Sequence, residues 1–294
     1  MSLWFFVSDL HGQPSRYRSL FDRILAEKPA AVFLGGDLLP HHMDGSWQST
    51  PEQDDFIRDF LAGSCQTVKS ELGAAYPKVF LILGNDDPRH CEVELLEGQR
   101  AGLWEYVHGR WVDWQGFHIL GYACIPPSPF QLKDWERYDV SRFVDPGCVS
   151  PEEGRRTAGP DNRYIRYATI ASELESLAGK TEDFSRTVLL SHCPPYDCPL
   201  DRAGLDGKMV DHVPLDVHIG SIAIRRFIEE KQPWLTLHGH VHESRTLTGH
   251  WHCRLGKTTS FNAANDTKEL ALVRLDPACP DQATLELVDP DPQP

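Results

Sequence analysis

Short apolar runs alternate with amphipathic segments along the first part of the chain. The runs that predict buried strands are residues 3–8, 31–34 and 79–83. Between them, around residues 14–25 and 52–72, apolar side chains recur at the three- and four-residue spacing of a helix face. This strand–helix–strand–helix–strand order predicts parallel pairing with right-handed crossovers, and it places ligands at the carboxyl ends of the strands.

The pattern changes after residue 100. Short strands are predicted at residues 103–107, 111–114 and 117–122. Residues 123–161 are rich in proline, glycine and charge, and a stretch this long with weak periodicity is usually functional. Because aromatic and basic side chains are mixed within it, we expect an ordered insert or lid.

The rest of the chain predicts a helix, a strand, a second helix and strand, and then antiparallel hairpins. These elements are residues 162–178, 187–191, 221–231 and 233–237, followed by strands at 245–248, 251–255, 258–262, 269–275 and 284–288. The sum is one α+β domain over residues 1–289, with two sheets, helices outside them, and a frayed tail at 290–294.

Composition narrows the class of protein. The 294 residues carry a net charge of −14, which argues against a long face for duplex nucleic acid. A small anionic substrate remains compatible, because bound cations supply local positive charge. The eight cysteines show no zinc-knuckle or disulfide spacing, and no apolar run approaches the roughly 20 residues that a membrane span needs. We therefore expect a cytoplasmic protein of reduced thiols, with no membrane association.

Chemistry-bearing side chains follow the predicted strands in five short segments. These are Asp9-x-His11, Gly36-Asp37, Gly84-Asn85-Asp86-Asp87, Ser191-His192 and Gly239-His240-Val241-His242. Carboxylate, carboxamide and imidazole groups together suit a pair of divalent cations. In a strand, residues i and i+2 face the same side, so Asp9 and His11 are expected to reach one metal.

Each segment has a simpler explanation when taken alone. Asp9 is also a candidate helix cap, Asp37 and Asn85 are also typical turn residues, and a single His192 is more often structural. The two imidazoles of His240 and His242 are the strongest signal. Their lettering recurs at Gly249-His250-Trp251-His252, which we assign to a hairpin turn because strands are predicted on both sides of it.

The ordered set resembles the calcineurin-like metallophosphoesterase family over residues 9–242. The resemblance implies a metallo-dependent phosphatase fold, a four-layer α/β/β/α sandwich of two mixed β-sheets flanked by helices. It also implies two divalent metal ions, with Mn²⁺, Fe²⁺/Fe³⁺ or Zn²⁺ as the usual occupants. By the same resemblance Asp9, His11 and His242 bind one metal, Asn85, His192 and His240 bind the second, and Asp37 bridges them.

The chain departs from the family pattern at one position. The family motif is G-N-H-D/E, and its histidine contacts the phosphate or protonates the leaving group; here Asp86 replaces it, and Asp87 matches the acidic residue that orients that histidine. A carboxylate beside two dications stays ionised, so it is a poor proton donor and repels phosphate. A monoester dianion suffers this repulsion more than a diester monoanion does.

Several residues are candidates for compensating roles. The candidate catalytic residues are Asn85, Asp86 and His192, and the candidate substrate-binding residues are Asn85, Arg89, His90, Trp135 and Arg137. Arg89 and His90 would replace the missing donor or clamp the phosphate, unless they are solvated loop residues. Trp135 and Arg137 would stack on and clamp a base or sugar, unless they pack the insert onto the sandwich. His41 and His42 are either an exposed loop pair or part of the pocket mouth.

The sequence thus predicts a dinuclear metal-dependent phosphodiesterase acting on a small, nucleotide-type diester, with a hydroxide between the metals as the nucleophile. A phosphomonoesterase or nucleotidase is the alternative within the same chemistry. A non-catalytic binding module on the same fold is the alternative of another class, and the presence of all seven ligand positions argues against it. The physiological substrate, the oligomeric state and the metals are not specified by the sequence.

Overall fold

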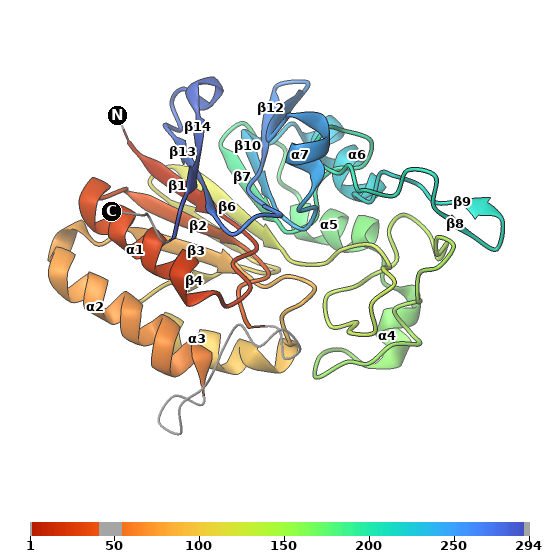
Figure 1. Cartoon of the computed structure of the whole chain (residues 1–294), viewed down its shortest axis with the longest axis horizontal. Coiled ribbons are helices and arrows are strands. Elements are labelled where there is room, and N and C mark those ends of the chain that lie inside the picture. Colours follow the sequence, from red (N-terminus) through yellow and green to blue (C-terminus); the bar gives the residue numbers. More distant parts are fainter. Residues whose placement is uncertain (1, 41–54, 291–294) are drawn as a thin grey trace.

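The computed structural model describes residues 2–40 and 55–290. His41, His42 and the tail from 291 to 294 lie outside these ranges, as does the first part of the helix expected from residue 52. The described chain forms two six-stranded mixed sheets that pack face to face with helices outside them (Figure 1). This is the α+β sandwich that the sequence predicts.

The first sheet has the strand order β14-β13-β1-β2-β3-β4. Its strands are β1 (Trp4–Val7), β2 (Ala31–Gly35), β3 (Lys78–Ile82), β4 (Glu105–Tyr106), β13 (Leu270–Leu275) and β14 (Thr284–Val288). Strands β1 to β4 are parallel, whereas β13 and β14 run antiparallel at the edge. Every residue of β1 and β2 is buried, as expected for parallel strands covered on both faces.

The second sheet has the strand order β11-β12-β10-β7-β6-β5. Its strands are β5 (Trp111–Trp114), β6 (Phe117–Tyr122), β7 (Thr187–Ser191), β10 (Leu235–His238), β11 (His252–Leu255) and β12 (Thr258–Asn262). The four central strands are parallel, and the edge strands β5 and β11 are antiparallel. Aromatic contacts join the sheets: the Trp4 ring lies 5.6 Å from Trp114 and 5.0 Å from Phe117.

Helices cover the outer faces of both sheets. The described helices are α1 (Pro14–Glu27), a π-helix (Phe56–Ala62) continued by α2 (Gly63–Leu72), α3 (Glu92–Arg100), α4 (Asn162–Tyr167), α5 (Ile170–Ala178), α6 (Ile222–Lys231) and α7 (Ser244–Thr248), with 3₁₀ turns at Gly73–Ala75, Arg89–Cys91 and Pro280–Gln282. Figure 1 shows α1, α2 and α3 beside the first sheet and α5 and α6 beside the second. A small hairpin, β8 (Met209–Val210) and β9 (Val213–Pro214), projects from the body. None of the helices in the described ranges combines the length and the apolar character that crossing a membrane requires.

Three predicted elements differ in the structure. The helix expected over 162–178 is broken, because Ala168 and Thr169 are extended and Thr169 caps α5 in a reciprocal capping box with Ser172. The strand expected at 245–248 is instead helix α7. The strand expected at 103–107 shortens to the two residues of β4, and β12 pairs in parallel with β10 rather than only in a hairpin.

Candidate metal centre

The five segments that follow the strands meet at one end of the two sheets. The loops after β1 and β2 are joined by backbone hydrogen bonds, from the Asp9 N–H to the Gly36 carbonyl (2.9 Å) and from the His11 N–H to the Asp37 carbonyl (2.8 Å). The loops after β7 and β10 are joined by the Gly239 N–H and the His192 carbonyl (2.9 Å). The carboxyl ends of parallel strands therefore bring all five segments together, as the topology predicts.

Four of the seven predicted ligands have a left-handed backbone. The φ angles are 56° at Asp9, 46° at His11, 50° at Asp37 and 71° at His240. Such conformations are uncommon outside glycine and concentrate at functional sites. They also correct the expectation that Asp9 and His11 share a strand face, because β1 ends at Val7 and both residues lie in the turn beyond it.

Four side chains form a tight cluster at the centre of this region. One ligand atom from each of Asp9, His11, Asp37 and His242 lies within 4.8 Å of the others. The His242 Nε2 atom is 2.9 Å from Asp9 Oδ1 and 3.1 Å from His11 Nε2. Two carboxylates and two imidazoles at this separation form a mixed oxygen and nitrogen donor set that fits a divalent transition metal.

A second group of donors adjoins the first through Asp37. The His192 Nε2 atom lies 3.2 Å from Asp37 Oδ2 and 3.1 Å from Asn85 Oδ1. The other ring nitrogen, Nδ1, faces the Gly35 carbonyl at 2.8 Å, and a carbonyl accepts only from N–H, so Nε2 is the atom directed at the cluster. The His240 ring lies 5.3 Å from the His192 ring, centroid to centroid. All seven predicted ligands are thus brought together.

The electrostatics of the centre favour a bound positive charge. Burial alone would raise the pKa of Asp9 and Asp37, but neighbouring histidines outweigh it, lowering the pKa of Asp37 to about 2 and that of Asp9 further. Burial would lower the pKa of His192, but Asp37 and Asp9 raise it to about 10. Burial together with the charge of His192 lowers the pKa of His240 to about 3, which keeps this imidazole in the neutral form that binds metals.

Glycines allow the donor groups to approach one another. A Cβ atom added at Gly84 would lie 2.3 Å from Asp37 Oδ1, and one added at Gly239 would lie 2.2 Å from Asp9 Oδ2. Contacts of this length are not tolerated, so any larger residue at these positions would displace a carboxylate of the cluster. The glycine that precedes a predicted ligand in the sequence is therefore part of the centre.

Asp86 lies at the edge of the cluster. Its backbone N–H donates to Asp37 Oδ1 at 2.8 Å, the Asn85 amide donates to its Oδ1 at 2.9 Å, and its Oδ2 atom is 3.8 Å from His11 Nδ1. The side chain is 22% exposed, whereas Asp37 beside it is buried. The carboxylate that replaces the family histidine is thus held next to the ligands and remains accessible from solvent.

Asp87 does not orient Asp86 through its side chain. The Asp87 carboxylate is buried and accepts backbone N–H groups from Leu38 (3.0 Å), Leu39 (2.8 Å) and Gly84 (2.9 Å). Burial and the nearby Asp37 raise its pKa to about 8. This carboxylate therefore joins the loop after β3 to the loop after β2, a role that the family motif does not suggest.

Arg89 and His90 point away from the predicted ligands. The Arg89 guanidinium pairs with Glu92 at 2.9 Å and lies 4.6 Å from the centre of the Trp135 ring. His90 is exposed, and its backbone N–H donates to the Thr157 hydroxyl. In this structure Arg89 fastens the loop to the insert, and neither side chain closes on the cluster.

The insert residues Trp135 and Arg137 are buried, at 0% and 2% exposure. The Trp135 indole donates to the Asp87 carbonyl at 2.8 Å, and the Arg137 Nε donates to Glu173 at 2.9 Å. Stacking on a substrate requires an accessible ring face, which Trp135 does not have here. Both residues pack the insert against the sandwich, which is the alternative that the sequence left open.

Two residues of the centre were missed by the sequence analysis. Arg16, on the buried side of α1, donates from Nη1 to the Asp9 carbonyl at 2.7 Å and from Nη2 to the Thr267 carbonyl, so it holds the left-handed Asp9 turn against the loop before β13. His238 is buried at the end of β10, where its Nδ1 faces the Cys193 carbonyl at 2.8 Å and supports the turn after β7. An arginine on the apolar face of the predicted helix was the available signal for the first.

The repeated lettering at residues 249–252 does not form a second centre. Gly249 has a φ of 76° and ends helix α7, and His252 opens β11, so the segment is a helix-to-strand turn rather than the expected hairpin turn. His250 and His252 are exposed, and neither belongs to a metal-compatible cluster within the described residues. The helix cap explains the glycine at this position.

We expect the double substitution His250→Ala/His252→Ala to leave the number of bound metal ions unchanged, because neither imidazole faces the cluster. The matched change, His240→Ala/His242→Ala, removes two predicted ligands and should lower bound metal by at least about one ion per chain. Elemental analysis of both variants after gel filtration measures this. Metal loss in the first variant would show that the second histidine pair is the functional one.

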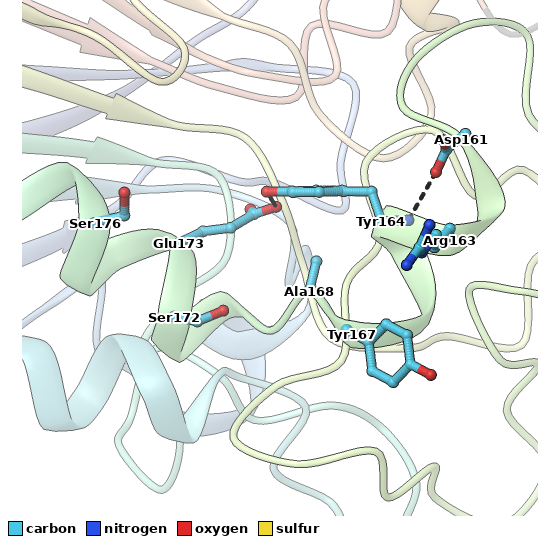
Figure 2. Close-up of a pocket in the computed structure, with 8 residues that line it drawn as sticks. All are labelled: Asp161, Arg163, Tyr164, Tyr167, Ala168, Ser172, Glu173 and Ser176. Carbon is cyan, nitrogen blue, oxygen red and sulfur yellow. Dashed lines mark hydrogen bonds between the residues drawn. The ribbon is translucent and has the colours of Figure 1, made fainter.

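A separate hollow lies between α4 and α5 (Figure 2). It is lined by Asp161, Arg163, Tyr164, Tyr167, Ala168, Ser172, Glu173 and Ser176, and it includes none of the predicted ligands. The Tyr164 hydroxyl points to Glu173, to which it donates at 2.9 Å, whereas the Tyr167 ring points away. This hollow belongs to the junction of the broken helix and not to the metal centre.

Comparisons with known proteins agree with this geometry. The family model described as calcineurin-like phosphoesterase matches residues 5–244, which include all seven predicted ligands. No curated protein is significantly similar in sequence. One crystal structure, 17% identical, covers 98% of this chain and 99% of its own, with a TM-score of 0.57. The protein TT1561 of Thermus thermophilus, 15% identical, covers 98% and 99%, with a TM-score of 0.56. These two similarities show the fold, and the extent of the family match shows that the chain belongs to the calcineurin-like phosphoesterase family.

Proposed function

We propose that the chain is a dinuclear metal-dependent phosphodiesterase whose substrate is a small, nucleotide-type diester. Family membership supports phosphoester hydrolysis. The candidate cluster supports metal dependence. The preference for a diester rests on a single observation, the position of Asp86 beside the ligands.

We assign the metals as the resemblance implies. Asp9, His11 and His242 would hold one ion, Asn85, His192 and His240 the second, and Asp37 both. In support of this, Asp37 contributes to the first cluster and also lies 3.2 Å from His192 in the second. Mn²⁺, Fe²⁺/Fe³⁺ or Zn²⁺ suit the donor set. Such a pair supplies Lewis acidity and makes water available as a nucleophile at neutral pH.

The charge at Asp86 distinguishes monoesters from diesters. Two unit charges about 4 Å apart interact by roughly 4 kcal/mol at an effective dielectric constant of 20. A monoester dianion carries one more negative charge than a diester monoanion, so it meets more repulsion from this carboxylate. Asp86 also lacks the proton-donating capacity of the imidazole that the family motif has here, so leaving groups that need no protonation are favoured.

The remaining parts of the proposal concern the whole chain. We propose one domain over residues 1–289, with residues 123–161 as its insert, and a cytoplasmic location. All eight cysteines are free, which suits a reducing compartment. The net charge of −14 disfavours long duplex nucleic acid as a substrate.

Hydrolysis of paired aryl substrates tests the proposal. With Mn²⁺ present, we expect kcat/KM for bis(4-nitrophenyl) phosphate to exceed that for 4-nitrophenyl phosphate by about tenfold, which corresponds to about 1.4 kcal/mol of transition-state discrimination. A tenfold preference for the monoester would instead support the phosphomonoesterase alternative. Absence of hydrolysis of both, with fewer than about one tightly held metal per chain, would support a binding module.

A further inference from the structure

We infer that Trp135, from the insert, is a positioning residue that holds the Asn85–Asp86 loop in place from behind. Its indole Nε1 donates to the backbone carbonyl of Asp87 at 2.8 Å. Trp135 and Asp87 are both fully buried, so water does not compete for this hydrogen bond. The inference rests on the proposed function, because it concerns the loop that carries a proposed ligand and the residue proposed to set specificity.

The loop is held from two opposite directions, and Asp87 is the residue at which they meet. On one side its carboxylate accepts the N–H groups of Leu38 and Leu39, which follow the bridging candidate Asp37. On the other side its carbonyl accepts the indole N–H of Trp135. Asn85 and Asp86 directly precede it, so their positions depend on both anchors.

A second contact between the insert and this loop lies two residues further on. Asp134 is buried, and its Oδ2 atom accepts the Arg89 N–H at 2.8 Å, while its Oδ1 atom accepts the Thr157 N–H at 2.7 Å. The Arg89 guanidinium also lies 4.6 Å from the centre of the Trp135 ring. Two adjacent insert residues thus bind both ends of the segment between Asp87 and Arg89.

Trp135 is itself firmly fixed, as a positioning residue must be. Its carbonyl accepts the Ile125 N–H at 2.8 Å, and the Arg137 N–H donates to the Ile125 carbonyl at 3.1 Å, so the insert folds back onto the chain just after β6. Beside it, Lys133 and Glu136 form a fully buried ion pair at 2.5 Å. These contacts hold the indole so that its N–H points at the loop.

Loss of the N–H group would leave the Asp87 carbonyl buried without this donor. An unsatisfied buried acceptor costs about 1–3 kcal/mol, and the loop avoids the cost by shifting. Because Asn85 and Asp86 lie next in the chain, such a shift changes the second metal's ligand set and the position of the discriminating carboxylate.

The substitution Trp135→Phe deletes the N–H donor and keeps an aromatic ring. Trp104→Phe is its matched control: Trp104 is also buried, and its Nε1 donates to the Leu95 carbonyl at the same 2.8 Å, but within the α3 region. Asp134→Asn is a second test of the same anchor that leaves the indole intact. Three measurements are needed: Mn²⁺ binding isotherms, amide hydrogen exchange of residues 84–90 in metal-free protein, and kcat and KM with bis(4-nitrophenyl) phosphate.

We expect Trp135→Phe to weaken the second Mn²⁺ by about tenfold, in line with the 10–100-fold effect of residues that orient metal ligands. Exchange of residues 84–90 should accelerate, and kcat should fall about tenfold with KM changed less than about twofold. Asp134→Asn should change all three in the same direction by less, and Trp104→Phe should change none of them.

The inference is overturned if Trp135→Phe and Trp104→Phe give equal metal affinities and equal exchange in residues 84–90, because the indole then contributes only to general packing. These two readouts do not depend on catalysis. An inactive wild-type protein would overturn the proposed function, while the binding isotherms and the exchange rates would still decide the role of Trp135.

Discussion

Asp37→Asn should lower kcat/KM for the preferred phosphoester by about 10³-fold or more, the largest effect of any single substitution in this chain. Residues that only orient metal ligands are worth about 10–100-fold, and Asp37 is proposed to contact both metals directly. In the structure it contributes to the four-residue cluster, lies 3.2 Å from His192 and accepts the Asp86 N–H. The neutral amide removes the charge shared by the two sites with little change in shape.

Steady-state rates and elemental analysis of purified Asp37→Asn test this together. We expect bound metal to fall from about two ions per chain to about one or fewer. Asp201→Asn is the matched control, because Asp201 is likewise a fully buried aspartate beside a histidine, 2.7 Å from His218 Nδ1, but is outside the predicted centre. Equal losses of metal in both variants would show that burial of the carboxylate, and not its place in the centre, is what matters.

Asp86→His should raise the ratio of monoesterase to diesterase activity by at least about tenfold. The change restores the imidazole of the family motif, removes a negative charge beside the phosphate site and adds a group that donates a proton at neutral pH. The hydrogen bond from the backbone N–H of residue 86 to Asp37 does not involve the side chain, so the bridging carboxylate keeps this contact. The ratio of kcat/KM values for 4-nitrophenyl phosphate and bis(4-nitrophenyl) phosphate measures the effect.

Asp86→Asn separates the two causes. It removes the charge without adding a proton donor, so a rise in the ratio equal to that of Asp86→His assigns the discrimination to charge alone. A larger rise in Asp86→His assigns the remainder to proton donation. An unchanged ratio in both variants would contradict the proposal, because Asp86 would then not face the substrate.

The order of the strands and the identity of the ligand-bearing segments could be predicted from the sequence. Fully apolar runs such as residues 31–34 are buried on both faces, and a strand of this kind leaves few alternatives. Glycine before Asp37, Asn85 and His240 marked sharp turns after strands, and the structure shows two of the three preceding glycines, Gly84 and Gly239, in contacts too close for any Cβ. These signals are local, so they are legible without the fold.

Local signals failed where a neighbour far along the chain determined the outcome. The helical pattern over residues 162–178 is continuous, but the side chain of Thr169 begins a new helix at Ile170. Residues 245–248 form a helix although their pattern suggested a strand. The reading of Asp9 and His11 as neighbours on a strand face brought them together correctly, yet the turn that does so has two left-handed residues, which the periodicity of a strand does not predict.

The sequence by itself determined which donor atoms this protein has and that strand ends carry them, because both follow from residue type and from short-range apolar spacing. Only the tertiary structure decided what surrounds those donors. Trp135 is 48 positions from Asp87 along the chain, and the indole–carbonyl hydrogen bond between them exists because the insert folds back after β6. A contact between segments so far apart has no local signature, since its geometry is set by the packing of the whole sandwich.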